Sequence, residues 1–224
     1  MLHEIFNLFF PRLCLGCGGP LNECEDFLCE HCKFDLPFTN YHSVRDNPIE
    51  QCFWGKVPVE RATSMLYYHK KGIVQSVIHS LKYRQCPEVG NYLGVMAAHC
   101  CGDFFCGMDY LMPVPLHKKK IRQRGYNQSR RIAEGIASVA GIAISEDLKR
   151  IVYTATQTHK DKFERYENTL HSFCLDNPQI YEGKHILLID DVLTTGSTLE
   201  SCVRAVLQAQ PNIRISVFTL GYAK

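Results

Sequence analysis

The chain has 224 residues, of which 46% are hydrophobic and 21% charged, and its formal net charge is +2. This composition is that of a folded globular protein and excludes a disordered or fibrous chain. A net charge so near zero gives no reason, for the chain as a whole, to expect a nucleic-acid partner.

The first thirteen residues carry a helical stripe of apolar side chains, formed by Leu2, Ile5, Phe6, Phe9 and Phe10. We interpret the stripe as a short helix docked on the core; a helix lying on a membrane surface is the alternative. There is no basic leader, no small-residue cleavage site and no apolar run of roughly 18 residues. We therefore expect a cytoplasmic protein.

Two Cys-x-x-Cys pairs come next in the chain. Cys14 and Cys17 are separated by eleven residues from Cys29 and Cys32, and Cys24 is left over. Each pair brings two thiolates together, and two pairs complete a tetrahedral shell for Zn²⁺. We predict a small zinc knuckle with a structural role; an iron site or reduced thiols without metal are the alternatives.

Residues 37–58 contain turn residues without a clear period, which is typical of a connecting segment. We therefore expect two units. Residues 1–58 would comprise the amino-terminal helix, the zinc knuckle and the connection, and residues 59–224 would form the main domain.

Strands alternate with helices from about Ala62 onward. Short strands are expected at residues 65–68, 110–114, 185–189 and 213–220, with helical stripes between them at 73–81, 89–100, 132–140 and 199–207. This alternation predicts the α/β class with a mostly parallel central sheet.

Residues 117–131 contain seven Lys or Arg and no acid. We expect residues 118–124 to precede a helix, with Arg130 and Arg131 in its first turn, where positive charge opposes the helix dipole. A pyrophosphate or a nucleic-acid backbone would offset this charge. The alternative is a basic surface that is solvated and binds no ligand.

The most informative string is residues 186–198, in which an apolar strand stops at Asp190 and Asp191 and a short loop leads into a helix. The loop and helix start supply one glycine and several hydroxyls, which together suit a phosphate: Thr194, Thr195, Gly196, Ser197 and Thr198. The two carboxylates would repel a phosphate but suit sugar hydroxyls, a divalent metal or a developing positive charge. Phosphate, diol and transient cation together describe a phosphoribosyl group.

This string resembles the signature of type I phosphoribosyltransferases, and the wider chain resembles the bacterial ComF competence family. The resemblance also includes the cysteine knuckle, residues 81–83, 113–117 and 124–128, and Gln157, Arg165, Asn168 and Phe173. It implies a Rossmann-like phosphoribosyltransferase fold that binds 5-phosphoribosyl-1-pyrophosphate with Mg²⁺, and a link to DNA uptake.

The resemblance also implies roles for residues outside the string. The pyrophosphate loop would be Val114, Pro115, Leu116 and His117. Residues 154–168, a long polar stretch, would close over the ligand as a hood and bring in Lys160 and the catalytic Arg165. Lys82 could reach the pyrophosphate, although a lysine at a helix end also complements the dipole.

Two functions follow from these expectations. In the first, Asp190 and Asp191 fix the ribose and stabilise an oxocarbenium-like transition state while an acceptor, which nothing in the sequence identifies, displaces pyrophosphate. In the second, the same pocket senses the ligand without catalysis, and the knuckle and basic segment bind single-stranded DNA or a competence helicase.

Overall fold

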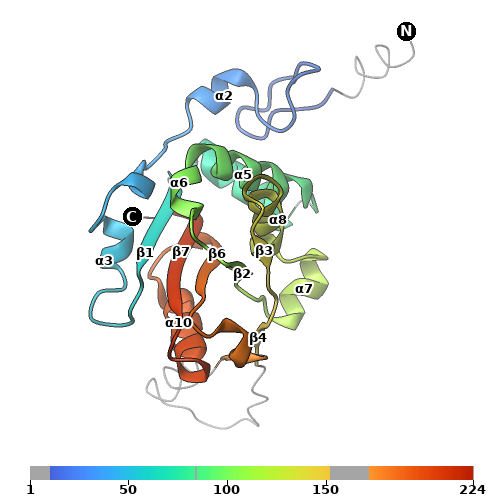
Figure 1. Cartoon of the computed structure of the whole chain (residues 1–224). Helices are drawn as coiled ribbons and strands as arrows, with labels where there is room; N and C mark the ends of the chain where they lie inside the picture. The colour runs from blue at the N-terminus through green and yellow to red at the C-terminus, as the bar shows by residue number, and fades with distance from the viewer. Residues whose placement is uncertain (1–10, 84, 152–171, 224) are drawn as a thin grey trace, which may run out of the picture.

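The centre of the protein is a five-stranded parallel sheet (Figure 1). The structure is a computed structural model that describes residues 11–83, 85–151 and 172–223. The strand order is β1-β7-β6-β2-β3, and every neighbouring pair is parallel. The bounds are β1 Arg61–Tyr67, β7 Arg214–Tyr222, β6 His185–Leu193, β2 Tyr110–Pro113 and β3 Ala143–Ile144. The predicted class is confirmed.

Helices cover both faces of the sheet. One face packs against the helices α4 (Ile73–Tyr83), α5 (Glu88–Cys100) and α8 (Gln128–Ala140) through a cluster that includes Leu187 and Ile189. The other face packs against α3 (Pro48–Gln51) and α10 (Ser197–Ala209) through a cluster that includes Leu188 and Val217. Leu187, Leu188 and Ile189 alternate between the two clusters because successive side chains of a strand point to opposite faces.

Shorter elements complete the described part of the chain. The short helices are α2 (Glu30–Phe34), α6 (Gly102–Phe105) and α7 (Lys118–Arg124), and the 3-10 turns are η1 (Tyr41–Ser43) and η2 (Pro178–Tyr181). Strands β4 (Leu148–Arg150) and β5 (Phe173–Leu175) form a separate antiparallel pair. No helix among the described residues has the length and apolar character needed to cross a membrane.

Two glycines let α5 and α8 touch along their backbones. A Cβ atom on Gly94 would lie 2.2 Å from the carbonyl oxygen of Ile132. A Cβ atom on Gly135 would lie 2.2 Å from the carbonyl oxygen of Asn91. Real Cβ atoms do not approach a backbone so closely, so this contact depends on glycine at both positions.

The cysteine knuckle packs directly on the helices above the sheet (Figure 1). Cys14, Leu28 and Cys32 are buried in the same apolar cluster as Val74 of α4 and Leu93 of α5. In addition, the ring of Phe27 meets that of Tyr92 edge-on, with centroids 5.4 Å apart. The knuckle therefore shares the apolar core of the main domain.

Two expectations about element bounds are wrong. Strand β6 does not stop before Asp190 but continues to Leu193, because β7 runs on beside it and pairs Asp190 with Thr219 and Leu193 with Tyr222. Residues 118–124 do not merely precede a helix; they form the helix α7. His117 caps α7 by accepting a hydrogen bond from the Lys119 N–H, and Gly125, at a φ of 81°, ends it.

The chain reverses its course between β2 and β6. After β2 it crosses to β3 through α8 on one face, and after β6 it crosses to β7 through α10 on the other face. The two strands are neighbours, with Pro113 paired with Ile189. In open α/β sheets a ligand binds beyond the carboxyl ends of two such strands, where helices leave on opposite faces. The fold thus predicts a ligand site at the residues that follow Pro113 and Ile189.

Candidate functional site

The carboxylates of Asp190 and Asp191 lie in β6 directly after Ile189, in the crevice at the carboxyl ends of β2 and β6. The Ser129 hydroxyl, in the first turn of α8, donates a hydrogen bond to Asp190 Oδ1 at 3.0 Å, and the Asp191 N–H donates to the same oxygen at 2.9 Å. Burial raises the pKa of Asp190 to about 7, and the charge of Asp191 adds to the rise. The hydrogen bonds to Asp190 and the charge of Lys82 act in the opposite direction. Near neutral pH Asp190 is therefore protonated in part of the molecules.

Lys82 balances the second carboxylate. Its Nζ lies 2.8 Å from Asp191 Oδ2, and the exposed fractions of the two side chains are 22% and 14%. The end of α4 that carries Lys82 is fixed by the Tyr126 hydroxyl, which donates to the Leu81 carbonyl oxygen at 2.6 Å. The guanidinium of Arg124 also lies 5.5 Å from the centre of the Tyr83 ring. The lysine is thus held at the acidic pair by its surroundings.

The loop after β6 turns tightly into α10. Gly196 has a φ of 79°, which an L-residue with a side chain rarely adopts. The hydroxyls of Thr195 and Ser197 lie 3.1 Å apart. A hollow of about 30 Å³ is lined by Asp190, the loop and the first turn of α10. This volume exceeds the roughly 10–15 Å³ that one water requires, and the helix N-terminus favours an anion there.

The segment after β2 is tied to the same place. The Val114 N–H donates to the Ile189 carbonyl oxygen at 2.9 Å, and Asn127 Nδ2 donates to the Val114 carbonyl oxygen at 3.0 Å. Asn127 also caps α8 by accepting from the Ser129 N–H at 3.0 Å. A continuous chain of hydrogen bonds therefore joins residue 114, the start of α8 and Asp190.

The structure thus brings together most of the predicted ligand-binding residues: Lys82, the loop at 114–117, the acidic pair and residues 194–198. Lys160 and Arg165 lie outside the described residues. Sequence reasoning missed Ser129 and Asn127 as members of the site. An Asn before a helical stripe is a recognisable N-cap signal and could have indicated Asn127; the contact of Ser129 with Asp190 spans 61 residues and has no local signal.

The four cysteines of the paired motif form a compact cluster. The sulfur atoms of Cys14, Cys17, Cys29 and Cys32 all lie within 4.8 Å of one another. Cys17 Sγ and Cys29 Sγ are 3.8 Å apart. A tetrahedral shell with Zn–S bonds of about 2.3 Å also places its sulfurs about 3.8 Å apart. The donor set and its spacing fit a zinc ion.

Backbone N–H groups surround these sulfurs. Gly16 and Cys29 each donate to Cys14 Sγ at 3.3 Å. Burial opposes ionisation of Cys14, but the backbone hydrogen bonds outweigh it and lower the pKa of this thiol to about 6. Because a zinc ligand must be a thiolate, these donors favour the ligand form of Cys14.

Comparison with known proteins gives matches along nearly the whole chain. The phosphoribosyl transferase domain model matches residues 127–223, which include Ser129, the acidic pair and the loop before α10. DNA utilization protein YhgH of Salmonella typhimurium is 29% identical over 217 residues, covering 90% of this chain and 93% of that protein. Competence protein ComFC of Bacillus subtilis is 35% identical over 212 residues, covering 93% of this chain and 83% of that protein.

This chain belongs to the ComF family. The ComF resemblance seen in the sequence is confirmed, and with it the α/β fold of type I phosphoribosyltransferases. Among solved structures, glutamine phosphoribosylpyrophosphate amidotransferase of B. subtilis is 20% identical with a TM-score of 0.45. That match covers 63% of this chain and 30% of the amidotransferase chain.

Proposed function

We propose that this ComF-family protein binds 5-phosphoribosyl-1-pyrophosphate and transfers its phosphoribosyl group to an acceptor. One observation carries the proposal: Asp190 and the loop at Gly196 line the same hollow. A ligand that bridges them needs a phosphate at one end and hydroxyl groups a few ångströms away, which is the arrangement of ribose 5-phosphate.

The chemistry assigned to each residue follows from its charge. The hydroxyls and N–H groups at the start of α10 hold the 5-phosphate, and the acidic pair accepts hydrogen bonds from the ribose hydroxyls. As the bond to pyrophosphate breaks, positive charge grows on the ribose beside Asp190 and Asp191 and is stabilised by them. Lys82 and the loop at residues 114–117 face the pyrophosphate, on which negative charge grows.

Magnesium would accompany the pyrophosphate. The ion prefers hard oxygen ligands, and the oxygen donors of this site are the carboxylates of the acidic pair, which would hold it directly or through water. When bound, Mg²⁺ neutralises charge on the pyrophosphate and makes it a better leaving group. In the knuckle, a zinc ion bound by four cysteines would be closed to substrates, so its role would be structural.

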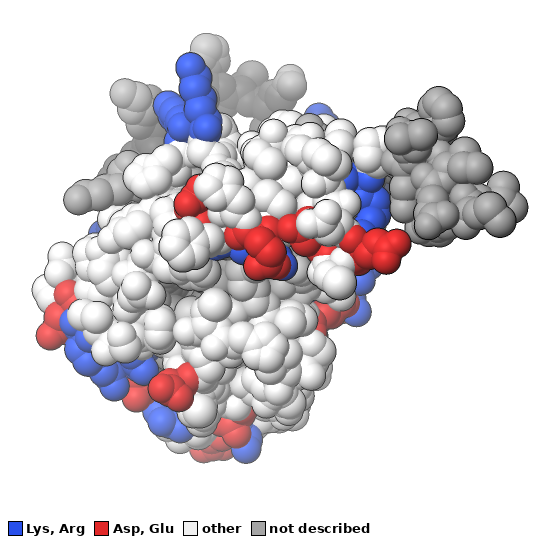
Figure 2. All heavy atoms as spheres, turned by 90° about the horizontal axis from the view of Figure 1, so that it is seen from above, with Lys and Arg blue, Asp and Glu red and all other residues white. Residues whose placement is uncertain are grey.

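A second candidate function is a ligand-sensing module without catalysis. It is favoured by the names of the relatives, which concern DNA utilization and competence, and by four exposed cations of α7, Lys118, Lys119, Lys120 and Arg122. The knuckle does not suit DNA, because Asp and Glu side chains gather on this end of the molecule (Figure 2), among them the exposed Glu23, Asp26, Glu30 and Asp35. Like charge would repel a phosphate backbone there.

Titration calorimetry with 5-phosphoribosyl-1-pyrophosphate and Mg²⁺ tests the proposal. We expect binding by the unmodified chain, and a loss of roughly tenfold or more for Asp190→Asn combined with Asp191→Asn, because hydrogen bonds to charged groups contribute about 1.5–3 kcal/mol. The matched control is Asp103→Asn, in α6. No binding by the unmodified chain would refute the proposed function, and release of pyrophosphate with an acceptor would separate the enzyme from the sensing module.

A further inference from the structure

The last turn of α4, which carries Lys82, is held by a segment far away in the sequence. Leu81 is one of the last four residues of α4, whose carbonyl oxygens have no N–H partner within the helix. The Tyr126 hydroxyl, 45 residues further along the chain, donates to the Leu81 carbonyl oxygen at 2.6 Å. The Tyr126 ring packs against the apolar cluster in which Leu81 is fully buried. A distant tyrosine thus caps the end of this helix.

Arg124 holds the other side of the same turn. Its guanidinium lies 5.5 Å from the centre of the Tyr83 ring, a distance at which cation and ring attract each other. Its Nη1 donates at 2.8 Å to Oε1 of Gln128, which is 1% exposed and begins α8. The buried amide therefore fixes the guanidinium over the ring. We call Arg124, Tyr126 and Gln128 the clasp.

The clasp is continuous with the loop at residues 114–117. Only α7 lies between them, and Asn127 ties the two ends of this stretch together, because its Nδ2 donates to the Val114 carbonyl oxygen at 3.0 Å. One stretch, residues 114–128, therefore contains the loop that we assign to the pyrophosphate and also holds the helix end that carries Lys82.

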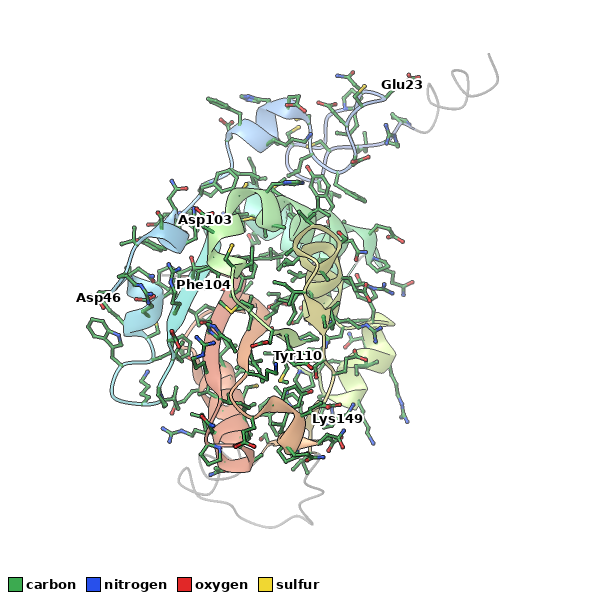
Figure 3. The ribbon with its side chains drawn as sticks, in the orientation of Figure 1. Glu23, Asp46, Asp103, Phe104, Tyr110 and Lys149 are labelled. Carbon is green, nitrogen blue, oxygen red and sulfur yellow. The ribbon has the colours of Figure 1, made fainter. Side chains whose placement is uncertain are left out.

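The charges of this stretch suit the same anion. Helix α7 carries four exposed cations, and residues 117–131 contain no acid. Figure 3 shows α7 on the same side of the molecule as the labelled Lys149 and on the opposite side from the labelled Asp46. An anion is therefore attracted to the side on which the clasp holds Lys82.

We propose that the clasp positions Lys82 for the pyrophosphate, so that Tyr126 and Arg124 act on the ligand through the lysine without touching it. This inference rests on the proposed function. The clasp fixes the backbone of residues 81–83, from which the Lys82 side chain reaches Asp191 in the free protein and the pyrophosphate in the complex. Without the clasp the last turn of α4 frays, and ligand binding must first order the lysine, which costs free energy.

Acetylation of the full chain tests the clasp without any ligand. Brief treatment with acetic anhydride, followed by mass spectrometry of the peptides, measures how fast each lysine reacts. We expect Lys82, whose side chain is 22% exposed and paired, to react several-fold more slowly than the exposed Lys70. Tyr126→Phe removes only the hydroxyl, so it should raise the rate at Lys82 roughly threefold or more and leave Lys70 unchanged. Arg124→Met should do the same.

Tyr92→Phe is the matched control. It also removes a tyrosine hydroxyl, but the buried Tyr92 hydroxyl has no hydrogen-bond partner among the described residues. Its loss should leave the rate at Lys82 as it is in the parent.

Calorimetry then tests the route through the lysine. Tyr126→Phe should bind 5-phosphoribosyl-1-pyrophosphate roughly threefold to tenfold more weakly, because one hydrogen bond is lost, and ribose 5-phosphate no more weakly than the parent. In a chain that already carries Lys82→Met, adding Tyr126→Phe should change neither affinity by more than about twofold. Two changes that act through one group are not additive.

The outcomes separate the two proposals. An unchanged rate at Lys82 in both Tyr126→Phe and Arg124→Met overturns the clasp. A loss of affinity for 5-phosphoribosyl-1-pyrophosphate that is as large with Lys82→Met as without it overturns the route through the lysine, and so does an equal loss for ribose 5-phosphate. If Lys82 reacts faster as expected but the unmodified chain does not bind 5-phosphoribosyl-1-pyrophosphate, the clasp stands and its role in binding fails together with the proposed function.

Discussion

Lys82 Nζ lies 2.8 Å from Asp191 Oδ2 across 109 residues of sequence, and the two side chains are mostly shielded from water. In the ligand-free protein the lysine therefore occupies the carboxylate that we assign to a ribose hydroxyl. In the proposed complex Lys82 turns from Asp191 to the pyrophosphate, and Asp191 turns to the ribose.

Replacing Lys82 with Met should separate its pairing with Asp191 from its attraction for the pyrophosphate. We expect affinity for 5-phosphoribosyl-1-pyrophosphate to fall by roughly tenfold, about 1.4 kcal/mol, because a cation facing the pyrophosphate is lost. Affinity for ribose 5-phosphate, which has no pyrophosphate, should stay the same or rise, because Asp191 is no longer blocked. Calorimetry with both ligands measures the difference, with Lys70→Met as the control. An equal loss for both ligands would show that Lys82 only maintains the structure.

Asp190 should make the stability of the ligand-free protein depend on pH. Burial raises its pKa to about 7, whereas an unfolded Asp has a pKa of about 3.9. Between these values the folded state keeps a proton that the unfolded state loses, so the contribution of this group falls as the pH rises from about 4 to 7. Asp190→Asn keeps the shape and the hydrogen-bond acceptor without the charge.

At pH 8 we therefore expect Asp190→Asn to have a larger free energy of unfolding than the parent, by on the order of 2–4 kcal/mol. Its melting temperature should rise accordingly. The advantage should shrink towards pH 4. Calorimetric melting in buffer without added Mg²⁺ or ligand measures it. A difference that is the same at both pH values would contradict the raised pKa.

The cysteine cluster should carry about one zinc ion per chain. Cys14→Ser with Cys17→Ser removes two of the four ligands, so elemental analysis of the variant should find almost no zinc. Because Cys14 is buried with α4 and α5 in one apolar cluster, the whole chain should melt at a lower temperature in one transition. Cys24→Ser, which changes an exposed cysteine outside the cluster, should keep the metal. Unchanged zinc in the double variant would exclude these ligands.

Gly196 should be essential for its backbone conformation rather than for space. A Cβ atom there would meet no atom closer than 3.6 Å, but the φ of 79° is costly for any residue with a side chain. We expect Gly196→Val, whose branched side chain is the harder to fit, to lose binding of ribose 5-phosphate more completely than Gly196→Ala. If the Val and Ala variants both bind ribose 5-phosphate as tightly as the parent does, the loop does not hold the phosphate.

The sequence was sufficient to predict the alternating class, the cysteine cluster and the strand–loop–helix around Asp190, because each has a local signal. It was not sufficient for the length of β6, which depends on pairing with β7 about 29 residues further along. It also missed Ser129 and did not indicate the Lys82–Asp191 pair, because those contacts arise only when distant segments meet in the crevice. The helix α7 was missed because its exposed, basic sequence has no apolar stripe, although His117 and Gly125 mark its ends.

The contact between Gly94 and Gly135 limits how this protein can be engineered. Exchanging a helical glycine for alanine normally stabilises a protein by up to about 1 kcal/mol, so both positions would attract a designer seeking heat resistance. Here the added methyl would force α5 and α8 apart, since each Cβ would lie 2.2 Å from a carbonyl oxygen. Helix α8 carries Ser129 on its first turn, so the displacement would reach Asp190 as well as the core. Thermostabilised variants of this scaffold should therefore keep both glycines and draw their gains from the surface.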